Sequence, residues 1–279
     1  MVSPDNTSPE LDRLLQHALG AWSLEADGAL IETPSSWVVP ARLGAEPAML
    51  KLMKDTSDEE YAAGLLAYYD GDGAVRVLAS DDRAVLLERA SGTRSLVAMA
   101  TSGRDDEAAT ILADITARLH APRARPAPAT LWPLEEWFSS LFEHEHQSDL
   151  LGRCATMARR LLAAPTDTMP LHGDMHHGNV LDGGERGWLA IDPKALLGER
   201  TYDIANQLCN PYPHAEIVHD ADRFRRLAAL YGDRLDIEPQ RILDMTFAYT
   251  GLSASWDMDD GDPDFALTNA EILAPVTSS

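Results

Sequence analysis

The sequence predicts an α+β protein in which a small antiparallel β-sheet with one inserted helix is followed by a larger, mainly helical part. Two observations support this prediction. Short strand-forming runs separated by turn residues fill most of the first third of the 279 residues, and apolar residues at helical spacing dominate after about residue 90. We therefore expect an N-terminal lobe over residues 1–90 and a C-terminal lobe over residues 91–279.

The first expected element is an amphipathic helix that begins at Pro9, a residue that suits the first helical position. Apolar residues then recur on one face until Gly20 ends the pattern. A second helix is predicted over residues 57–69, where Ser57 and Glu60 have the spacing of a capping box. The strands of the expected sheet cover residues 37–42, 48–53, 74–79 and 83–88.

Helical spacing predicts that the second lobe is built mainly of helices. Apolar residues recur at this spacing over residues 108–119, and again over residues 134–162 after a proline-rich break. Two short apolar strands, residues 179–181 and 188–191, then flank a turn over residues 182–187. Because loops on a rigid scaffold carry function disproportionately, we expect the chemistry near these two strands.

The chain is strongly acidic, with 23 lysines and arginines, 45 aspartates and glutamates, and a formal net charge of -22. This charge disfavours nucleic acids and anionic membrane surfaces as partners. Two explanations stay open, a solubilising surface or recognition of a cationic small molecule. The sequence has only two cysteines and contains neither a signal-peptide pattern nor a long apolar run, so we expect a cytoplasmic protein without a membrane span.

An ordered set of polar residues in the second lobe predicts phosphoryl transfer. Asp174 and Asn179 lie five residues apart, and Asp192 follows after a short hairpin. Phosphoryl transfer requires a carboxylate that orients and deprotonates the acceptor hydroxyl, together with oxygen ligands for Mg²⁺. We therefore expect Asp174 to be the catalytic base, and Asn179 and Asp192 to be the Mg²⁺ ligands.

A lysine in the first lobe extends this hypothesis. Lys51 lies inside an apolar strand, where an ammonium group is costly unless an anion such as a nucleotide phosphate pairs with it. An acid on the following helix is expected to hold Lys51 in place, and Glu60 is the first candidate, with Glu59 as the alternative. Glu60 also fits a capping box, so its catalytic and structural explanations both stay open.

The segments that carry this chemistry resemble a known family. They are residues 171–181 (LHGDMHHGNVL), 188–194 (WLAIDPK) and 198–203 (GERTYD). In this order they are similar to the aminoglycoside phosphotransferases of kinase-like fold, and most closely to the branch of streptomycin 6-phosphotransferases and hydroxyurea phosphotransferases. Residues 69–76 and 119–122 look like further segments of the family, so the resemblance covers most of residues 35–260.

The resemblance implies a protein-kinase-like fold of two lobes, with ATP in the cleft between them. The roles that it implies are those inferred above from the residues themselves for Lys51, Asp174, Asn179 and Asp192. In this family, main-chain groups of the connector between the lobes bind the adenine. The connector here runs from Glu88 to Ala90, so these two residues are the implied adenine contacts.

Two segments depart from the protein-kinase pattern. No Gly-x-Gly-x-x-Gly motif precedes Lys51, and the corresponding turn, residues 33–36, would cover phosphates only through hydroxyls and main-chain N–H groups. The dipeptide Pro-Lys follows Asp192 in place of Phe-Gly, so no flip of that motif is implied. Lys194 has two open interpretations, a contact with the γ-phosphate or an ion pair with Glu199.

The acceptor is expected on the C-terminal side of Asp174, where acidic side chains would attract a cationic ligand. The candidates are Glu199, Asp203, Asp257, Asp259 and Asp260. Asp203 has a structural alternative as the cap of a helix over residues 204–208, and the acids from Asp257 onward have one as an exposed turn. The histidine-rich residues 143–146 are expected on a solvated helix, because positions i and i+2 point to different faces.

The motifs and the resemblance together predict a MgATP-dependent O-phosphotransferase. Its expected acceptor is a small, cationic hydroxyl compound, foremost an aminoglycoside such as streptomycin, which would make the protein an antibiotic-resistance enzyme. Hydroxyurea or another small metabolite is the alternative acceptor. The other class of function is a catalytically silent nucleotide-binding relative, but such proteins usually lack one of the four motif residues that this sequence retains. The sequence predicts no oligomeric state.

Overall fold

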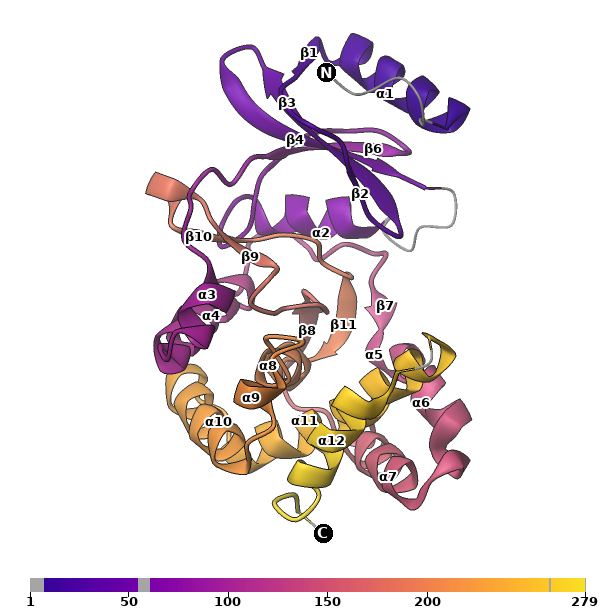
Figure 1. Cartoon of the computed structure of the whole chain (residues 1–279), viewed down its shortest axis with the longest axis vertical. Coiled ribbons are helices and arrows are strands. Elements are labelled where there is room, and N and C mark those ends of the chain that lie inside the picture. The colour runs from indigo at the N-terminus through magenta and orange to yellow at the C-terminus, as the bar shows by residue number, and fades with distance from the viewer. Residues whose placement is uncertain (1–7, 55–60, 261, 279) are drawn as a thin grey trace.

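The chain begins with a sheet-rich part and continues with a helical part (Figure 1). The computed structural model describes residues 8–54, 61–260 and 262–278. The strands of the first part are β1 (Leu24–Ala26), β2 (Ile31–Glu32), β3 (Ser36–Leu43), β4 (Glu46–Met53), β5 (Val77–Ser80) and β6 (Ala84–Glu88). They form one antiparallel sheet in the order β1-β3-β4-β6-β5, with β2 paired to β3.

Strand β4 presents different residues to the two faces of this sheet. Leu50 and Leu52 are fully buried on the face that is covered by helix α1 (Pro9–Ala21), which begins at Pro9 as predicted. Because side chains alternate along a strand, Lys51 points to the opposite face, toward the second lobe. The alternation in β4 therefore places the one lysine of this strand in the space between the two lobes.

The strand predicted over residues 74–79 is wrong in its first half, because β5 begins only at Val77. The main-chain N–H of Val75 donates to the carbonyl of Ala190 (3.1 Å), and the N–H of Ala190 donates to the carbonyl of Gly73 (2.8 Å). These residues pair with a strand of the second lobe in place of the first sheet. The exchange joins the two lobes by main-chain hydrogen bonds.

Helix α2 (Ala62–Tyr69) lies between the sheet and the second lobe (Figure 1). Its side chains Leu65 and Leu66 are buried in the larger hydrophobic core. The predicted start of this helix, with the capping box of Ser57 and Glu60, lies outside the described residues. The helix thus closes the sheet on the face opposite to α1.

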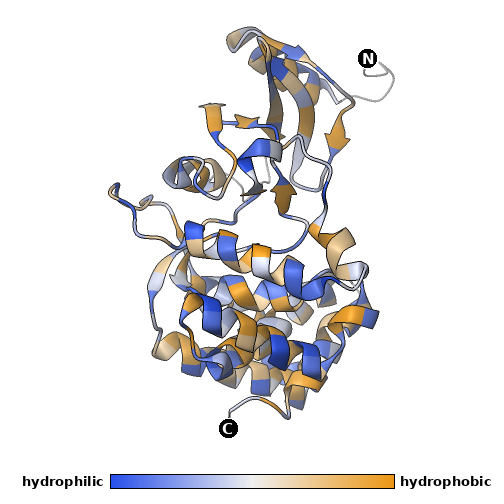
Figure 2. Ribbon diagram, turned by 90° about the vertical axis from the view of Figure 1, so that its left-hand side faces the viewer, coloured by the Kyte–Doolittle hydropathy of each residue, from blue (hydrophilic) through white to orange (hydrophobic). Residues whose placement is uncertain are grey.

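Helix α11 (Pro239–Asp260) packs against five helices of the second lobe, α6, α7, α8, α10 and α12. The other described helices of this lobe are α3 (Leu96–Thr101), α4 (Asp105–Leu119), α5 (Leu134–Trp137), α6 (Ser139–His144), α7 (Asp149–Ala163), α8 (Thr201–Leu208), α9 (Ala215–Val218), α10 (Ala221–Leu235) and α12 (Asp264–Leu273), with the 3₁₀ helices η2 (Glu145–Gln147) and η3 (Gly184–Arg186). Hydrophilic and hydrophobic residues alternate along these helices (Figure 2). Among the described residues, no helix combines the length and apolarity needed to cross a membrane.

Short strands in the second lobe frame two loops. These strands are β7 (Trp132–Pro133), β8 (Thr168–Leu171), β9 (Val180–Asp182), β10 (Trp188–Ala190) and β11 (Leu196–Glu199). Strand β11 lies between β7 and β8, and β9 pairs with β10 as an antiparallel hairpin. The β8–β9 loop carries residues 172–179 and the β10–β11 loop carries residues 191–195, so both predicted motifs lie on loops held by paired strands.

Candidate active site

A buried histidine holds the β8–β9 loop in place. His172 donates from Nε2 to the carbonyl of Ile191 (2.8 Å), and its Nδ1 accepts the main-chain N–H of Asp174 (3.2 Å). Burial lowers the pKa of the His172 ring, which favours the neutral form that these two hydrogen bonds require. Gly173 has a φ of +83°, and a Cβ there would lie 2.8 Å from Cγ of Leu196, so this turn requires glycine.

Two asparagine amides fix the carboxylate of Asp174. Asn179 donates from Nδ2 to Oδ2 of Asp174 (3.0 Å) and to its main-chain oxygen (2.9 Å), while Asn206 donates from Nδ2 to Oδ1 (3.0 Å). Each carboxylate oxygen keeps a further lone pair with which to accept a proton. No described residue donates to the amide oxygen of Asn179, which leaves this oxygen for a cation.

Asn206 belongs to a chain of hydrogen bonds that runs from Asp174 to Tyr212. Its Oδ1 accepts from Nδ2 of Asn210 (2.8 Å), and Oδ1 of Asn210 accepts the main-chain N–H of Tyr212 (3.1 Å). Asn206 is buried, whereas Tyr212 is 63% exposed. Sequence reasoning missed both asparagines. Their i, i+4 spacing was the one available signal, and it shows neither that Asn206 donates to Asp174 nor that Asn210, which follows the end of α8, donates to Asn206.

Lys51 reaches across the space between the lobes to Asp192. Its Nζ lies 2.8 Å from Oδ1 of Asp192. Lys51 is only 8% exposed, and Asp192 adopts a left-handed φ of +58°, which aspartate tolerates better than most residues. Both side chains line a cleft of about 320 Å³ that also contains Asp174 and Asn179. The other residues of its lining are Thr33, Pro34, Ser35, Pro193 and Lys194.

The oxygen atoms in this cleft match the ligand preference of Mg²⁺. The carboxylate of Asp192 and the amide oxygen of Asn179 are hard donors, and Mg²⁺ in nucleotide sites takes one or two such side chains plus phosphates and waters. In the described part of the chain, no three or more histidine, cysteine, aspartate or glutamate side chains are grouped so that they could hold a metal ion. The histidines and glutamates of residues 143–146 therefore form no such group. The donor set therefore fits a cation that arrives with a phosphate ligand.

The structure speaks against one of the two interpretations of Lys194, the ion pair with Glu199. Lys194 lies in the wall of the cleft, and Glu199 does not. Glu199 is paired with Arg241 instead, with an N–O distance of 2.6 Å. Lys194 therefore adds a second ammonium group to the cleft. The predicted partners of Lys51, Glu60 and its alternative Glu59, lie outside the described residues.

The connector between the lobes begins at the end of β6. The main-chain N–H of Glu88 donates to the carbonyl of Arg76 (2.9 Å), and its carboxylate lies 3.0 Å from Nε of Arg186. The side chain of Glu88 therefore joins the connector to the β9–β10 turn. The main-chain N–H of Ala90 forms no hydrogen bond with any described residue, so it is available to a ligand.

A second pocket of about 320 Å³ shares Asp174 with the cleft. Asp257, one of the predicted acceptor contacts, lies in its wall. Aromatic side chains from three separate segments also line it, namely Tyr212, Tyr249 and Phe265. Tyr212 and Phe265 meet edge to face, with ring centroids 5.0 Å apart. The pocket thus combines a carboxylate with aromatic faces, both of which attract organic cations. The side chains of Asp259 and Asp260 are not among those described.

Asp203, predicted as an acceptor contact, has a structural position instead. Its buried carboxylate accepts the main-chain N–H groups of His172 (3.0 Å) and Gly173 (2.7 Å) and contacts Nε2 of His120 (2.9 Å). Burial alone would raise the pKa of Asp203, but the hydrogen bond and charge of His120 leave it below the usual value. Asp203 lies inside α8 and does not cap it, so both sequence interpretations give way to a brace for the β8–β9 loop.

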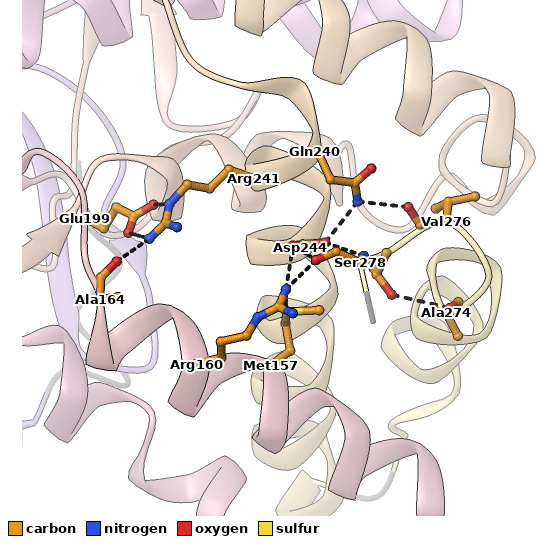
Figure 3. Close-up of polar contacts among 11 residues, drawn as sticks. Met157, Arg160, Ala164, Glu199, Gln240, Arg241, Asp244, Ala274, Val276 and Ser278 are labelled. Atoms are coloured by element: carbon orange, nitrogen blue, oxygen red, sulfur yellow. Dashed lines mark hydrogen bonds and ion pairs between the residues drawn. The ribbon is translucent and has the colours of Figure 1, made fainter.

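Glu199 requires the same correction. Its buried carboxylate accepts from Nε and Nη2 of Arg241 (2.6 Å each), from the hydroxyl of Thr201 (2.7 Å) and from the main-chain N–H of Thr166 (3.0 Å). Figure 3 shows Arg241 between Glu199 and the carbonyl of Ala164. Glu199 contributes to neither pocket, because its oxygens are already engaged within the second lobe.

The variant Glu199→Gln is expected to lower the free energy of unfolding by about 1–3 kcal/mol at pH 7, since it weakens a charged hydrogen-bond pair. Burial raises the pKa of Glu199, but Arg241 more than offsets this and leaves it below the usual value. The carboxylate therefore stabilises the fold above its unfolded pKa, and this contribution is lost as the pH falls below about 4. Urea unfolding should show a larger difference from wild type at pH 7 than at pH 3. If Glu199→Gln kept normal stability but bound the acceptor more weakly, Glu199 would be an acceptor contact, as the sequence predicted.

The fold and the cleft together define a kinase-like phosphotransferase, and comparison with solved structures confirms the fold. An ethanolamine kinase from Plasmodium vivax matches with a TM-score of 0.66 and 14% identity over 99% of this chain and 93% of the other. The choline kinase of Streptococcus pneumoniae matches with a TM-score of 0.61 and 16% identity, over 95% of this chain and 98% of the other. The predicted α+β, protein-kinase-like fold of two lobes is correct.

Sequence comparison specifies the family. A family model described as aminoglycoside/hydroxyurea antibiotic resistance kinase matches residues 21–261. Streptomycin 3''-kinase of Klebsiella pneumoniae is 51% identical over 250 residues, covering 86% of this chain and 91% of the relative. Streptomycin 6-kinase of Streptomyces griseus is 33% identical over 263 residues, covering 90% and 84%. The chain belongs to the aminoglycoside/hydroxyurea antibiotic resistance kinase family, as the resemblance predicted.

Proposed function

We propose that this protein transfers the γ-phosphoryl group of MgATP to a hydroxyl of streptomycin. The observation that carries the proposal is the position of Asp174, whose carboxylate is shared by two pockets of different chemistry. One pocket holds Lys51, Lys194 and the predicted Mg²⁺ ligands, and the other holds Asp257 and aromatic side chains. A base between a phosphate site and a cation site is the arrangement that phosphorylation of a cationic alcohol requires.

The cleft residues divide the binding of MgATP among them. Lys51 and Lys194 would pair with phosphate oxygens, and Asn179 with Asp192 would hold Mg²⁺, which neutralises charge on the triphosphate when bound. The main-chain N–H of Ala90 would donate to the adenine, with Glu88 at the start of the same connector. In this proposal the lobe over residues 1–90 binds most of the nucleotide, and the lobe over residues 91–279 supplies the base and the acceptor site.

Asp174 would act as the general base of the transfer. Its carboxylate accepts the proton of the acceptor hydroxyl as that oxygen forms a bond to the γ-phosphorus, and the bond to the leaving oxygen of ADP breaks. Asn179 and Asn206 hold the carboxylate in one orientation before the acceptor arrives. Such positioning lowers the entropy lost on reaching the transition state.

The 3''-hydroxyl of streptomycin is the acceptor group that we propose. The relative with 51% identity is a streptomycin 3''-kinase, whereas those with 33% and 32% identity are streptomycin 6-kinases. Streptomycin carries guanidinium and ammonium groups, which suit the carboxylate and aromatic faces of the second pocket. Hydroxyurea, the substrate named for a relative with 31% identity, is the second candidate, although it carries no positive charge for Asp257 to attract. Since the reaction consumes ATP, we place the protein in the cytoplasm.

The test is an acceptor screen with the purified protein, MgATP, and streptomycin, hydroxyurea or kanamycin. We expect streptomycin-dependent ADP release, with a product whose phosphorus couples to the 3'' proton in two-dimensional NMR. Coupling to the 6 proton would move the proposal to the other hydroxyl. Faster ADP release with hydroxyurea, or no release with any acceptor, would contradict the proposed function.

A further inference from the structure

Helix α12 places an asparagine amide without partners in the wall of the acceptor pocket. Asn269 is completely buried, and neither its Oδ1 nor its Nδ2 has a hydrogen-bond partner in the described part of the chain. The other two asparagines of this wall, Asn206 and Asn210, use their amides within the protein. Asn269 is thus the one asparagine in this wall whose amide has both its donor and its acceptor groups unused.

An unpaired buried amide destabilises a folded protein. Leaving such a group without partners costs its full desolvation free energy, and an apolar side chain of similar shape avoids this cost. Ala266 lies one turn before Asn269 on the same face of α12 and also lines the pocket, so an apolar residue would continue this surface. The fold itself therefore gives no structural reason for an amide at this position.

We propose that Asn269 is a specificity-determining residue of the acceptor site. Its Oδ1 accepts a hydrogen bond from an ammonium, guanidinium or hydroxyl group of the acceptor, and its Nδ2 donates to an adjacent acceptor oxygen. The matching ligand is an amino sugar or aminocyclitol, which presents a hydroxyl beside a nitrogen cation. Asp257, in the same pocket, balances the positive charge. This inference rests on the proposed function, because it assigns a recognition group to the same site.

The test is the variant Asn269→Leu, compared with wild type and with Thr268→Val, a neighbour on α12 that does not line the pocket. We expect the KM for streptomycin to rise about 10- to 100-fold in Asn269→Leu, which is the loss of hydrogen bonds to a charged group. The KM for ATP and the kcat at saturating streptomycin should change by less than about threefold, as for a lost binding contact. Thr268→Val should match wild type in every kinetic constant.

Thermal unfolding separates recognition from a structural role. If Asn269 serves the ligand, Asn269→Leu should have a Tm equal to or above that of wild type without ligand, because an unpaired buried amide has been removed. A lower Tm with an unchanged KM for streptomycin would overturn the inference, since the amide would then be satisfied within the protein. If Asn269→Leu does not fold, Asn269→Ala carries the same expected rise in KM, and an unchanged KM in that variant is equally decisive.

The proposed function and this inference fail in different ways. The streptomycin assignment is refuted if the wild-type protein phosphorylates another acceptor and not streptomycin. The ratio of KM values between Asn269→Leu and wild type is then measured with that acceptor. A ratio near one refutes the role of Asn269 with any amino sugar or aminocyclitol as the acceptor. A raised ratio with hydroxyurea would also overturn the inference, because that ligand has no amino sugar for Asn269 to recognise.

Discussion

Replacement of Asp174 by asparagine is expected to lower kcat by about 10²- to 10⁴-fold, the usual contribution of a general base. An amide cannot accept the hydroxyl proton, and its own N–H group would face a donor from Asn179 or Asn206. The affinity for MgATP should stay close to that of wild type, because the contact between Lys51 and Asp192 is unchanged. Single-turnover kinetics measure the chemical step, and isothermal titration calorimetry measures nucleotide binding.

Glu199→Gln is the matched control for this variant. It makes the same change from carboxylate to amide in the same lobe, but at a residue outside both pockets. It should lower stability and leave kcat unchanged, the reverse of the result at Asp174. Near-normal turnover in Asp174→Asn would remove the base from the proposed mechanism, whatever the result for nucleotide binding.

The variant Asp192→Ala is expected to abolish the Mg²⁺-dependent part of ATP binding, which weakens the affinity for MgATP by about tenfold or more. The substitution removes the carboxylate proposed as a Mg²⁺ ligand. It also removes a negative charge from the cleft, because this carboxylate lies 2.8 Å from Nζ of the buried Lys51. In the presence of EDTA, the variant should therefore bind ATP at least as well as wild type does.

Titration calorimetry with and without Mg²⁺ separates these two effects. Asp192→Asn keeps an oxygen ligand and loses the charge, so its affinity for MgATP should lie between those of wild type and Asp192→Ala. An unchanged response to Mg²⁺ in Asp192→Ala would show that Asp192 is not a ligand. Weaker binding of ATP in EDTA would show that its main role is to position Lys51.

Local patterns were enough to predict those parts of the cleft that lie within a single strand or a single loop. Lys51 was predictable because strand alternation alone sends it to the face opposite Leu50 and Leu52. Asp174 and Asn179 were predictable as neighbours because a single loop joins them. The part of the helix prediction that contained Glu60 lies outside the described residues, so its pairing with Lys51 stays a prediction.

The roles of the other acids depended on partners that are distant in sequence. In the sequence, Glu199 and Asp203 are acids near the motifs, as Asp257 is. In the structure, Arg241 binds Glu199 from 42 residues away. His120 contacts Asp203 from 83 residues away. No local pattern predicts such pairs. The same holds for the segment after Gly73, whose main chain pairs with Ala190 of the other lobe in place of its own sheet.

The chain of hydrogen bonds from Tyr212 through Asn210 and Asn206 to Asp174 couples two properties that evolution would otherwise adjust separately. They are the shape of the pocket and the orientation of the Asp174 carboxylate. Asn210 and Tyr212 line the pocket, and the same amide of Asn210 keeps Asn206 aimed at the carboxylate of Asp174. A substitution at Asn210 that admits bulkier ligands to the pocket would therefore also loosen the carboxylate of Asp174. A wider range of acceptors gained by changing Asn210 should be accompanied by slower turnover, whereas changes at positions outside this hydrogen-bond chain would avoid that trade-off.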